Sequence, residues 1–369
     1  MACETLPLPA SSPGQNVYIT VCRFGTLGTE RKAYIQASTH ADEVPAALTA
    51  MHLRRLLENA ERAGRIRGEI VLVPAANPPG FAQALLGHHM GRHHLPSGRN
   101  FNRFWPDATQ AVFAMRESFG EDPVANAARV RHIVSETLAA LQANAADEHL
   151  KLMLMRLAHD ADIVLDLHTD DDADMHLYVD PDHWPGLADL AGLLDAKVVM
   201  FARGSGGNAF EETVAAPFVA LREAGIPCEL PVTVTVELRG RLDVDDALAA
   251  RDARALFDFL ILRGIIEGEA EAPEFSGIAA PFEATEPVRA PAGGICVFLK
   301  ARGAHVEAGE VIAEIADPVA DVRTPVRTRA AGRLFTRCLH RLVHAGDVIA
   351  KVQGTAPLPG RRKGQLMTD

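Results

Sequence analysis

The sequence predicts a mixed α/β protein in which a central sheet is flanked by helices and followed by a smaller all-β domain. Along residues 16–266, short and nearly continuous apolar runs alternate with longer stretches of helical periodicity. Apolar runs of this kind are typical of strands that helices cover on both faces of a sheet. Beyond residue 267 the pattern changes to glycine-bearing hairpins, which indicates a separate β-rich domain.

The apolar pattern divides the first part of the chain into individual elements. Leu48, Met51, Leu53, Leu56 and Leu57 recur at helical spacing, whereas the apolar run within Ala161–His168 is nearly continuous, as in a buried strand. Strands are expected within 16–37 (two runs joined by the turn GTLGTE) and at 68–78, 161–168, 196–202 and 232–238, and helices at 44–64, 123–157 and 245–266.

The composition change near residue 267 predicts two domains, a catalytic domain at 1–268 and a β-rich domain at 269–369. The second domain contains two similar phrases, HVEAGEVIAEI at 305–315 and LVHAGDVIAKV at 342–352. Their similarity predicts two related hairpin units.

Charge and composition exclude several classes of protein. The formal net charge of −11 argues against a nucleic-acid surface, which needs clustered Lys and Arg. No apolar run is long enough to span a bilayer, and the N-terminus lacks the pattern of a signal peptide. The five cysteines are scattered without CxxC spacing, so we expect neither a disulfide framework nor a thiolate zinc site. Free cysteines of this kind suggest a cytoplasmic protein.

Three candidate functional residues stand at the ends of predicted strands. His40 follows the strand KAYIQAS, His168 ends the strand 161–168, and Glu237 lies near the end of 232–238. Ligands of open α/β sheets gather at the carboxyl ends of the strands. The three side chains are therefore expected in one site.

His40 and Glu43 have the spacing of a metal-binding pair, because a strand end and the first turn of the next helix can face one cleft. Zinc binds imidazole nitrogen and carboxylate oxygen, and a catalytic site keeps one position open. His168 is the favoured third ligand, with Asp166 as its hydrogen-bond partner. The residues alone leave other divalent ions open, as well as three other histidines: His159, His176 and His183.

Five short motifs in this order resemble the succinylglutamate desuccinylase/aspartoacylase family, which has a zinc carboxypeptidase-like fold. They are HADE, NPPGF, GRNFNRFWP, DLHT and VTVEL, between about residues 30 and 240. The resemblance implies one zinc ion bound by His40, Glu43 and His168. The glycine that the family usually has before the acidic pair is Ala41 here.

The resemblance also implies the catalytic and substrate-binding residues. Glu237 matches the general base, which takes a proton from the water that zinc activates and returns it to the leaving amine. Asn102 and Arg103 match residues that bind the substrate's α-carboxylate, while Asn100 replaces the family's usual Asp. Arg92 resembles a second substrate-contacting arginine and is expected to stabilise the oxyanion, with Arg99 as the competing candidate.

An acidic run, Thr169–Asp174, follows His168 directly. Because such a run would repel an anionic substrate, it suggests an N-acyl substrate with a cationic group that Asp170 or Asp172 contacts. The alternative is a solvated loop. A glycine-rich segment later in the chain is expected to be a mobile loop from which Arg203 reaches the substrate.

The sequence thus predicts a zinc-dependent deacylase of small N-acyl amino acids or related amines, with no nucleic-acid or membrane partner. The runner-up is a metallocarboxypeptidase of short peptides. A third reading makes the β-rich domain a carrier module modified at Lys300, although the tripeptides typical of biotinyl and lipoyl attachment are absent. The histidines at 88, 89, 93 and 94 fit a second metal site or a mobile lid, and a homo-oligomer is left open.

Overall fold

The computed structural model describes residues 2–10, 12–29 and 31–362, and its contacts divide the chain into two compact units. The first unit comprises the chain up to His168 together with Asn208–Thr235 and Val244–Glu271. The second comprises Thr169–Gly207, Val236–Asp243 and the chain from Ala272 onward. The predicted boundary after residue 268 lies close to Ala272, but two earlier segments also group with the C-terminal part.

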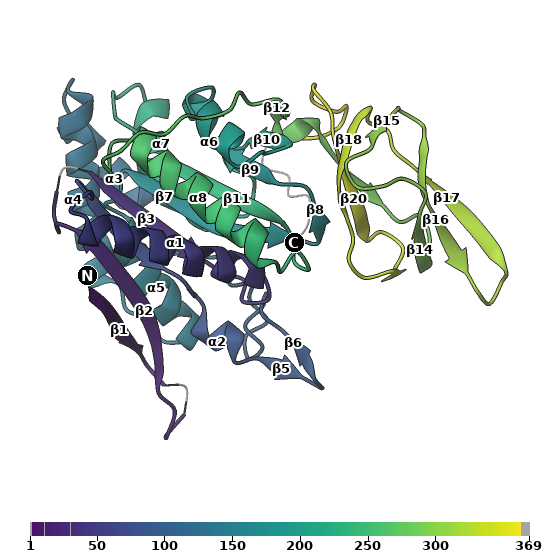
Figure 1. Cartoon of the computed structure of the whole chain (residues 1–369), viewed down its shortest axis with the longest axis horizontal. Coiled ribbons are helices and arrows are strands. Elements are labelled where there is room, and N and C mark those ends of the chain that lie inside the picture. Colours follow the sequence, from purple (N-terminus) through teal and green to yellow (C-terminus); the bar gives the residue numbers. More distant parts are fainter. Residues whose placement is uncertain (1, 11, 30, 363–369) are drawn as a thin grey trace. The chain divides into compact units, whose positions relative to one another are not determined.

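The first unit contains the greater part of the predicted central sheet (Figure 1). Its strands lie in the order β1 (Ala2–Leu8), β2 (Val17–Gly25), β4 (Glu69–Val73), β3 (Lys32–Ala37), β7 (Ile163–Asp170) and β11 (Val232–Gly240), of which the last two continue into the second unit. The β3 strand is parallel to β4 and β7, whereas β1 and β2 are antiparallel. The mixed sheet that the apolar pattern predicts is therefore confirmed.

Helices cover this sheet, and every residue of β3 and β4 is buried. They are α1 (Val44–Arg62), α2 (Pro78–Phe81), α3 (Thr109–Ala114), α4 (Pro123–Ala140), α5 (Ala146–Ala158), α7 (Phe210–Glu223) and α8 (Asp246–Leu262), with a short hairpin of β5 (Ala84–Leu85) and β6 (His88–His89). The α1 and α8 helices pack side by side (Figure 1). Among the described residues, no helix combines the length and the hydropathy that crossing a membrane demands.

The continuous helix predicted over 123–157 is interrupted in the structure. The α4 helix ends at Ala140, and Leu141 takes an extended conformation. The carboxylate of Glu148 then accepts hydrogen bonds from the backbone N–H groups of Asn144 and Ala145, at 3.0 and 3.3 Å. These hydrogen bonds satisfy backbone N–H groups at the start of α5, as the glutamate of a capping box does, and a second helix begins there.

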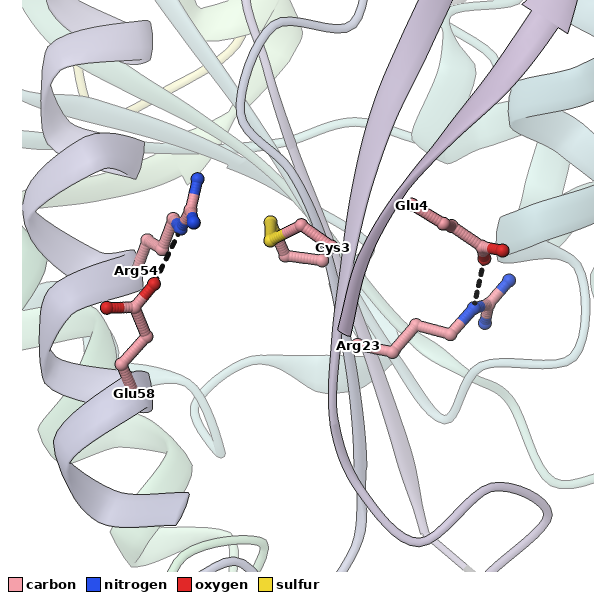
Figure 2. The surroundings of a disulfide bond; sticks show 6 residues. Cys3, Glu4, Arg23, Arg54 and Glu58 are labelled. Atoms are coloured by element: carbon pink, nitrogen blue, oxygen red, sulfur yellow. Dashed lines mark hydrogen bonds and ion pairs between the residues drawn. A yellow bond between two sulfur atoms is a disulfide. The ribbon is translucent and has the colours of Figure 1, made fainter. Parts of the chain in front are cut away.

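The expectation that the cysteines form no disulfide is wrong for one pair. Cys3 of β1 and Cys22 of β2 are bonded, and Figure 2 shows their surroundings beside the Arg23–Glu4 ion pair. The two residues are direct partners in the antiparallel register, with Cα atoms 4.0 Å apart. The two cysteines are 19 residues apart in sequence and meet because their strands pair. A search for CxxC spacing does not detect such a pair.

The second unit contains three parallel strands and two further sheets. The parallel strands are β9 (His176–Val179), β10 (Val198–Phe201) and β12 (Ile278–Pro281), with α6 (Ala188–Leu193). One further sheet has β13 (Thr285–Arg289), β20 (Val348–Gln353), β18 (Gly332–Arg337) and β15 (His305–Val306), with β8 (Asp172–Ala173) also on β18. The other has β17 (Val322–Arg327), β16 (Val311–Asp317), β14 (Gly294–Phe298) and β19 (Leu342–Val343).

The two similar phrases of the β-rich domain form equivalent structures, as predicted. In each, a two-residue strand (β15 or β19) leads through a glycine turn into a long strand (β16 or β20) of the other sheet. Gly309 and Gly346 have φ of 85° and 93°, which favours glycine at both turns. The carboxylates of Glu310 and Asp347 each accept the backbone N–H three residues earlier.

Candidate metal centre

Three buried side chains of the first unit form one group that could hold a metal ion: His40, Glu43 and His168. His40 lies in the turn after β3, Glu43 is the N-cap residue of α1, and His168 lies in β7, which pairs with β3. Their potential ligand atoms all lie within 4.8 Å of one another. Within the described part of the chain, this is the only such group of His, Cys, Asp and Glu.

The turn that holds His40 and Glu43 needs an unusual backbone. Ser38 has a φ of 59°, in the left-handed region, and its hydroxyl donates to the carbonyl oxygen of Glu43 at 3.0 Å. Ala41 does not adopt a positive φ, so alanine is compatible with this turn. Gly91 is required beside it, since a Cβ there would lie 2.1 Å from the backbone nitrogen of Asp42.

Hydrogen bonds fix which nitrogen of each histidine faces the centre of the group. Nε2 of His40 lies 2.8 Å from Oδ1 of Asn100, and that oxygen also accepts the N–H of Asn102. Nε2 of His168 lies 2.8 Å from Oδ2 of Asp166. Both Nε2 atoms therefore face an oxygen acceptor outside the group, and both Nδ1 atoms face Glu43, at 2.8 Å from its two carboxylate oxygens.

A buried chain of hydrogen bonds holds Asp166, the hydrogen-bond partner of His168, in place. Oδ1 of Asp166 accepts the amide of Gln36 at 2.9 Å, and Gln36 also donates to the hydroxyl of Thr39. The hydroxyl of Tyr34 donates to the amide oxygen of Gln36 at 2.8 Å. Tyr34, Gln36 and Asp166 are fully buried. Gln36 is not among the site residues that the sequence predicts, although a glutamine within the apolar strand KAYIQAS is a signal of such a role.

The three residues of the group shift one another's pKa values. Burial disfavours charge on Glu43, but the two imidazoles outweigh it and hold the pKa of Glu43 well below its usual value. Burial also disfavours charge on His168, yet the carboxylates of Asp166 and Glu43 raise its pKa well above the usual value. Burial and the nearby Arg92 lower the pKa of His40.

The structure brings Arg92 and Asn102 to this group. Nη1 of Arg92 lies 3.4 Å from both His40 Nδ1 and Glu43 Oε1. Nδ2 of Asn102 lies 3.3 Å from His168 Nε2, while its Oδ1 accepts the indole N–H of Trp105 and the backbone N–H at residue 210. Arg103 is partly buried and donates to the carbonyl oxygen of Asn102 at 2.7 Å.

Glu237 lies on β11 in the second unit and is half-buried. Its charge helps to raise the pKa of Lys351, a buried residue of β20, although Asp170 contributes more and burial opposes both. The base predicted from the sequence therefore lies in a charged cluster that includes a side chain of the C-terminal sheet.

The acidic run after His168 is paired with basic residues of the same unit. Asp170 forms an ion pair with Lys351, and Asp172 accepts hydrogen bonds from Arg302 at 3.0 Å and Arg337 at 2.6 Å. Burial opposes charge on Asp170, but Lys351 outweighs it and lowers the pKa of Asp170 to about 2. Asp171 and Asp174 have similar partners in Arg241 and Arg333. The run is neither a bare negative patch nor a solvated loop, because β8 joins the sheet of β18.

Arg203 has partners of its own. Its guanidinium lies 2.8 Å from Asp180 and 2.9 Å from Asp182, and these carboxylates raise its pKa. The competing histidines lie outside the metal group. His176 is fully buried, and burial lowers its pKa to about 4. The four histidines around Arg92 form no second metal group among the described residues.

Comparisons with known proteins agree with this architecture. The sequence model of the succinylglutamate desuccinylase/aspartoacylase catalytic domain matches residues 29–263. No curated protein matches the sequence. A solved family member from Shewanella amazonensis is 24% identical, with a TM-score of 0.84, and the match covers 96% of this chain and 98% of that one.

Two other solved structures share the fold at lower identity. The ectoine utilization protein EutE (DoeB) from Ruegeria pomeroyi, solved with product bound, is 20% identical with a TM-score of 0.67, over 96% of this chain and 95% of that one. A Rhodobacter sphaeroides succinylglutamate desuccinylase/aspartoacylase is 18% identical with a TM-score of 0.68, over the same shares. Because the family model covers most of the chain and five motifs occur in order, this chain belongs to the succinylglutamate desuccinylase/aspartoacylase family.

Proposed function

We propose that this protein is a zinc-dependent deacylase that hydrolyses the amide bond of a small N-acyl amino acid or a related amine. The observation that carries the proposal is the buried group of His40, Glu43 and His168, with both Nδ1 atoms facing the carboxylate. Two imidazoles and one carboxylate are a ligand set that zinc takes in catalytic sites, with a position left open. A zinc ion bound there would polarise the amide carbonyl and make water nucleophilic near neutral pH.

The other residues have distinct roles in this proposal. Glu237 accepts a proton from the attacking water and delivers it to the leaving nitrogen. Arg92, whose guanidinium lies 3.4 Å from Glu43, stabilises the negative charge that develops on the carbonyl oxygen. Arg103 binds the substrate carboxylate, and Asn102 has Nδ2 for the same purpose, since Trp105 occupies its oxygen.

The proposal includes no cationic group on the substrate. That preference depended on unpaired charge in the acidic run, whereas Asp170 and Asp172 form ion pairs with Lys351, Arg302 and Arg337. Arg203 is likewise engaged by Asp180. The substrate carboxylate, bound by Arg103, is the recognition element that we propose instead.

A deacylation screen tests the function directly. The purified protein, with zinc and with chelator, is incubated with N-acyl acidic, neutral and basic amino acids and with short peptides. We expect zinc-dependent release of a free amine from one class of N-acyl amino acid. Cleavage of peptides alone would establish the metallocarboxypeptidase instead, and no hydrolysis of any amide would refute both.

Replacing Arg103 by Met should raise KM for carboxylate-bearing substrates about 10–100-fold, because a hydrogen-bonded ion pair to the carboxylate is lost. Steady-state kinetics on the best substrate of the screen measures this change. Arg99→Met is the matched control, since Arg99 pairs with Glu148 at 2.9 Å. Equal kinetics of the two variants would remove Arg103 from the substrate site.

Replacing Gln36 by Leu should weaken metal binding about tenfold, because Asp166 then loses the hydrogen bond that holds it against His168. Competition with a chelator of known affinity measures the effect without any activity assay. Gln353→Leu is the matched control: Gln353 is also fully buried and hydrogen-bonded, to Thr285 at 2.6 Å. If both variants bound metal as the unmodified protein does, Gln36 would have no role in positioning His168.

A further inference from the structure

Three cysteines of the described chain are free thiols, and two of them belong to the same hydrophobic core in the β-rich domain. Cys296 lies on β14 of the four-stranded sheet, and Cys338 directly follows β18 of the five-stranded sheet. Both pack into the core between these sheets, and the backbone N–H of Cys296 donates to the carbonyl oxygen of Arg341, three residues beyond Cys338, at 2.7 Å. Cysteines on facing strands of one core can be joined by a disulfide if the backbones shift slightly.

We propose that Cys296 and Cys338 are a redox modification site, at which a hydroperoxide converts the adjacent thiols into a disulfide that links the two sheets of the β-rich domain. Access favours Cys338 as the first thiol to react. It is half-buried and lines a cavity of about 350 Å³ together with Arg289 and His340, whereas Cys296 is only 3% exposed.

The charges around the pair favour thiolate chemistry. The hydrogen bond from Cys338 lowers the pKa of Cys296, and Arg341 and Arg337 lower it further against the effect of burial. The same hydrogen bond raises the pKa of Cys338, which keeps the shared proton. The guanidinium groups of Arg337 and Arg341 lie over the ring of Phe298, at 5.3 and 4.6 Å from its centre.

The oxidation balances with hydrogen peroxide as the only other reactant. The shared proton moves to the Cys296 sulfur, and the Cys338 sulfur attacks one peroxide oxygen, which breaks the O–O bond and releases hydroxide. Cys338 is then a sulfenic acid. The Cys296 sulfur attacks the Cys338 sulfur, the S–O bond breaks, and the departing hydroxide takes the Cys296 proton as water. Two thiols are oxidised to one disulfide while the peroxide is reduced.

The disulfide would affect the thermal stability of the β-rich domain. The N–H of Cys296 donates to the carbonyl oxygen of Arg341 at 2.7 Å, and that of Cys338 to Ile349 at 2.6 Å. The bond would close a loop that contains β15 to β18, and closing a loop reduces the conformational entropy of the unfolded chain. The oxidised protein should therefore unfold at a higher temperature than the reduced protein.

Peptide mapping of the full-length protein tests the site. The protein is treated with graded hydrogen peroxide, its remaining thiols are alkylated, and non-reducing digests are examined by mass spectrometry. We expect one new cross-link, between the peptides of Cys296 and Cys338, with the loss of two hydrogen atoms and a raised Tm. Dithiothreitol should remove the new cross-link.

Two variants sharpen the result. Cys338→Ser should abolish the new cross-link, whereas Cys228→Ser should leave it intact, because Cys228 is buried and its pKa is raised to about 11. The proposal is overturned if Cys338 accumulates as sulfinic acid without a cross-link, or if the cross-link joins other cysteines. Mapping of the unmodified protein alone decides this, even if a variant fails to fold.

Discussion

Replacing Glu237 by Gln should lower kcat by roughly 10³-fold while the protein keeps its metal, because the amide cannot accept a proton from the attacking water. The side chain retains its size, so KM should change little and the loss should lie in the chemical step. Steady-state kinetics with the best substrate of the deacylation screen, together with metal analysis of the same sample, measures the effect.

A charge change elsewhere in the chain is the control for a general electrostatic effect. Lys300→Met removes the charge of a lysine of the β-rich domain that pairs with Glu310. It should leave kcat within about twofold of the unmodified protein, because a surface substitution outside the proposed catalytic residues usually changes stability little. If Glu237→Gln retained more than about a tenth of the activity with full metal content, another group would have to be the general base.

Replacing His168 by Ala should remove both the bound metal and all metal-dependent hydrolysis, since two of the three proposed ligands then remain. Elemental analysis after dialysis gives the metal content, and we expect about one zinc ion per chain in the unmodified protein and almost none in the variant. His176→Gln is the matched control, because His176 is equally buried but lies outside the group. Retention of stoichiometric zinc by His168→Ala would contradict the proposed ligand set.

The same site should release protons when it binds zinc. The carboxylates of Asp166 and Glu43 outweigh burial and raise the pKa of His168 well above its usual value, so in the metal-free protein its imidazole keeps a proton to higher pH than an ordinary histidine. A ligand must lose its proton before it coordinates. Zinc affinity should therefore increase with pH until the pH exceeds the pKa of His168, and calorimetry in buffers of different ionisation enthalpy would show the proton release. A pH-independent affinity below that point would contradict this reading of His168.

Local pattern was enough to predict most elements of the sheet and the candidate ligands. The buried strands are short apolar runs, and β3 is one of them. His40 and Glu43 are three residues apart, so the turn that presents them is largely a local property. His168 required more, because its neighbours depend on the pairing of β7 with β3, and there the order of the family motifs supplied what spacing could not.

The tertiary structure decided which charges and thiols meet. Asp170 and Asp172 lie 181 and 165 residues from Lys351 and Arg337, and no local pattern predicts that β8 pairs with β18. Because of these long-range contacts, the carboxylates of the acidic run form ion pairs within the protein and are not left to bind a cationic substrate. Strand register likewise joins Cys3 to Cys22.

The sequence by itself therefore determined the family, the mixed sheet with its β-rich appendage, and the types of residue at the candidate metal centre. The tertiary structure decided that Asn100 and Asp166 orient the two imidazoles, that Gln36 supports Asp166, and that the acidic run is neutralised. The physical reason is the distance along the chain over which each interaction acts. Helix and strand propensity act over a few residues, whereas hydrogen bonds and ion pairs depend on which strands become neighbours.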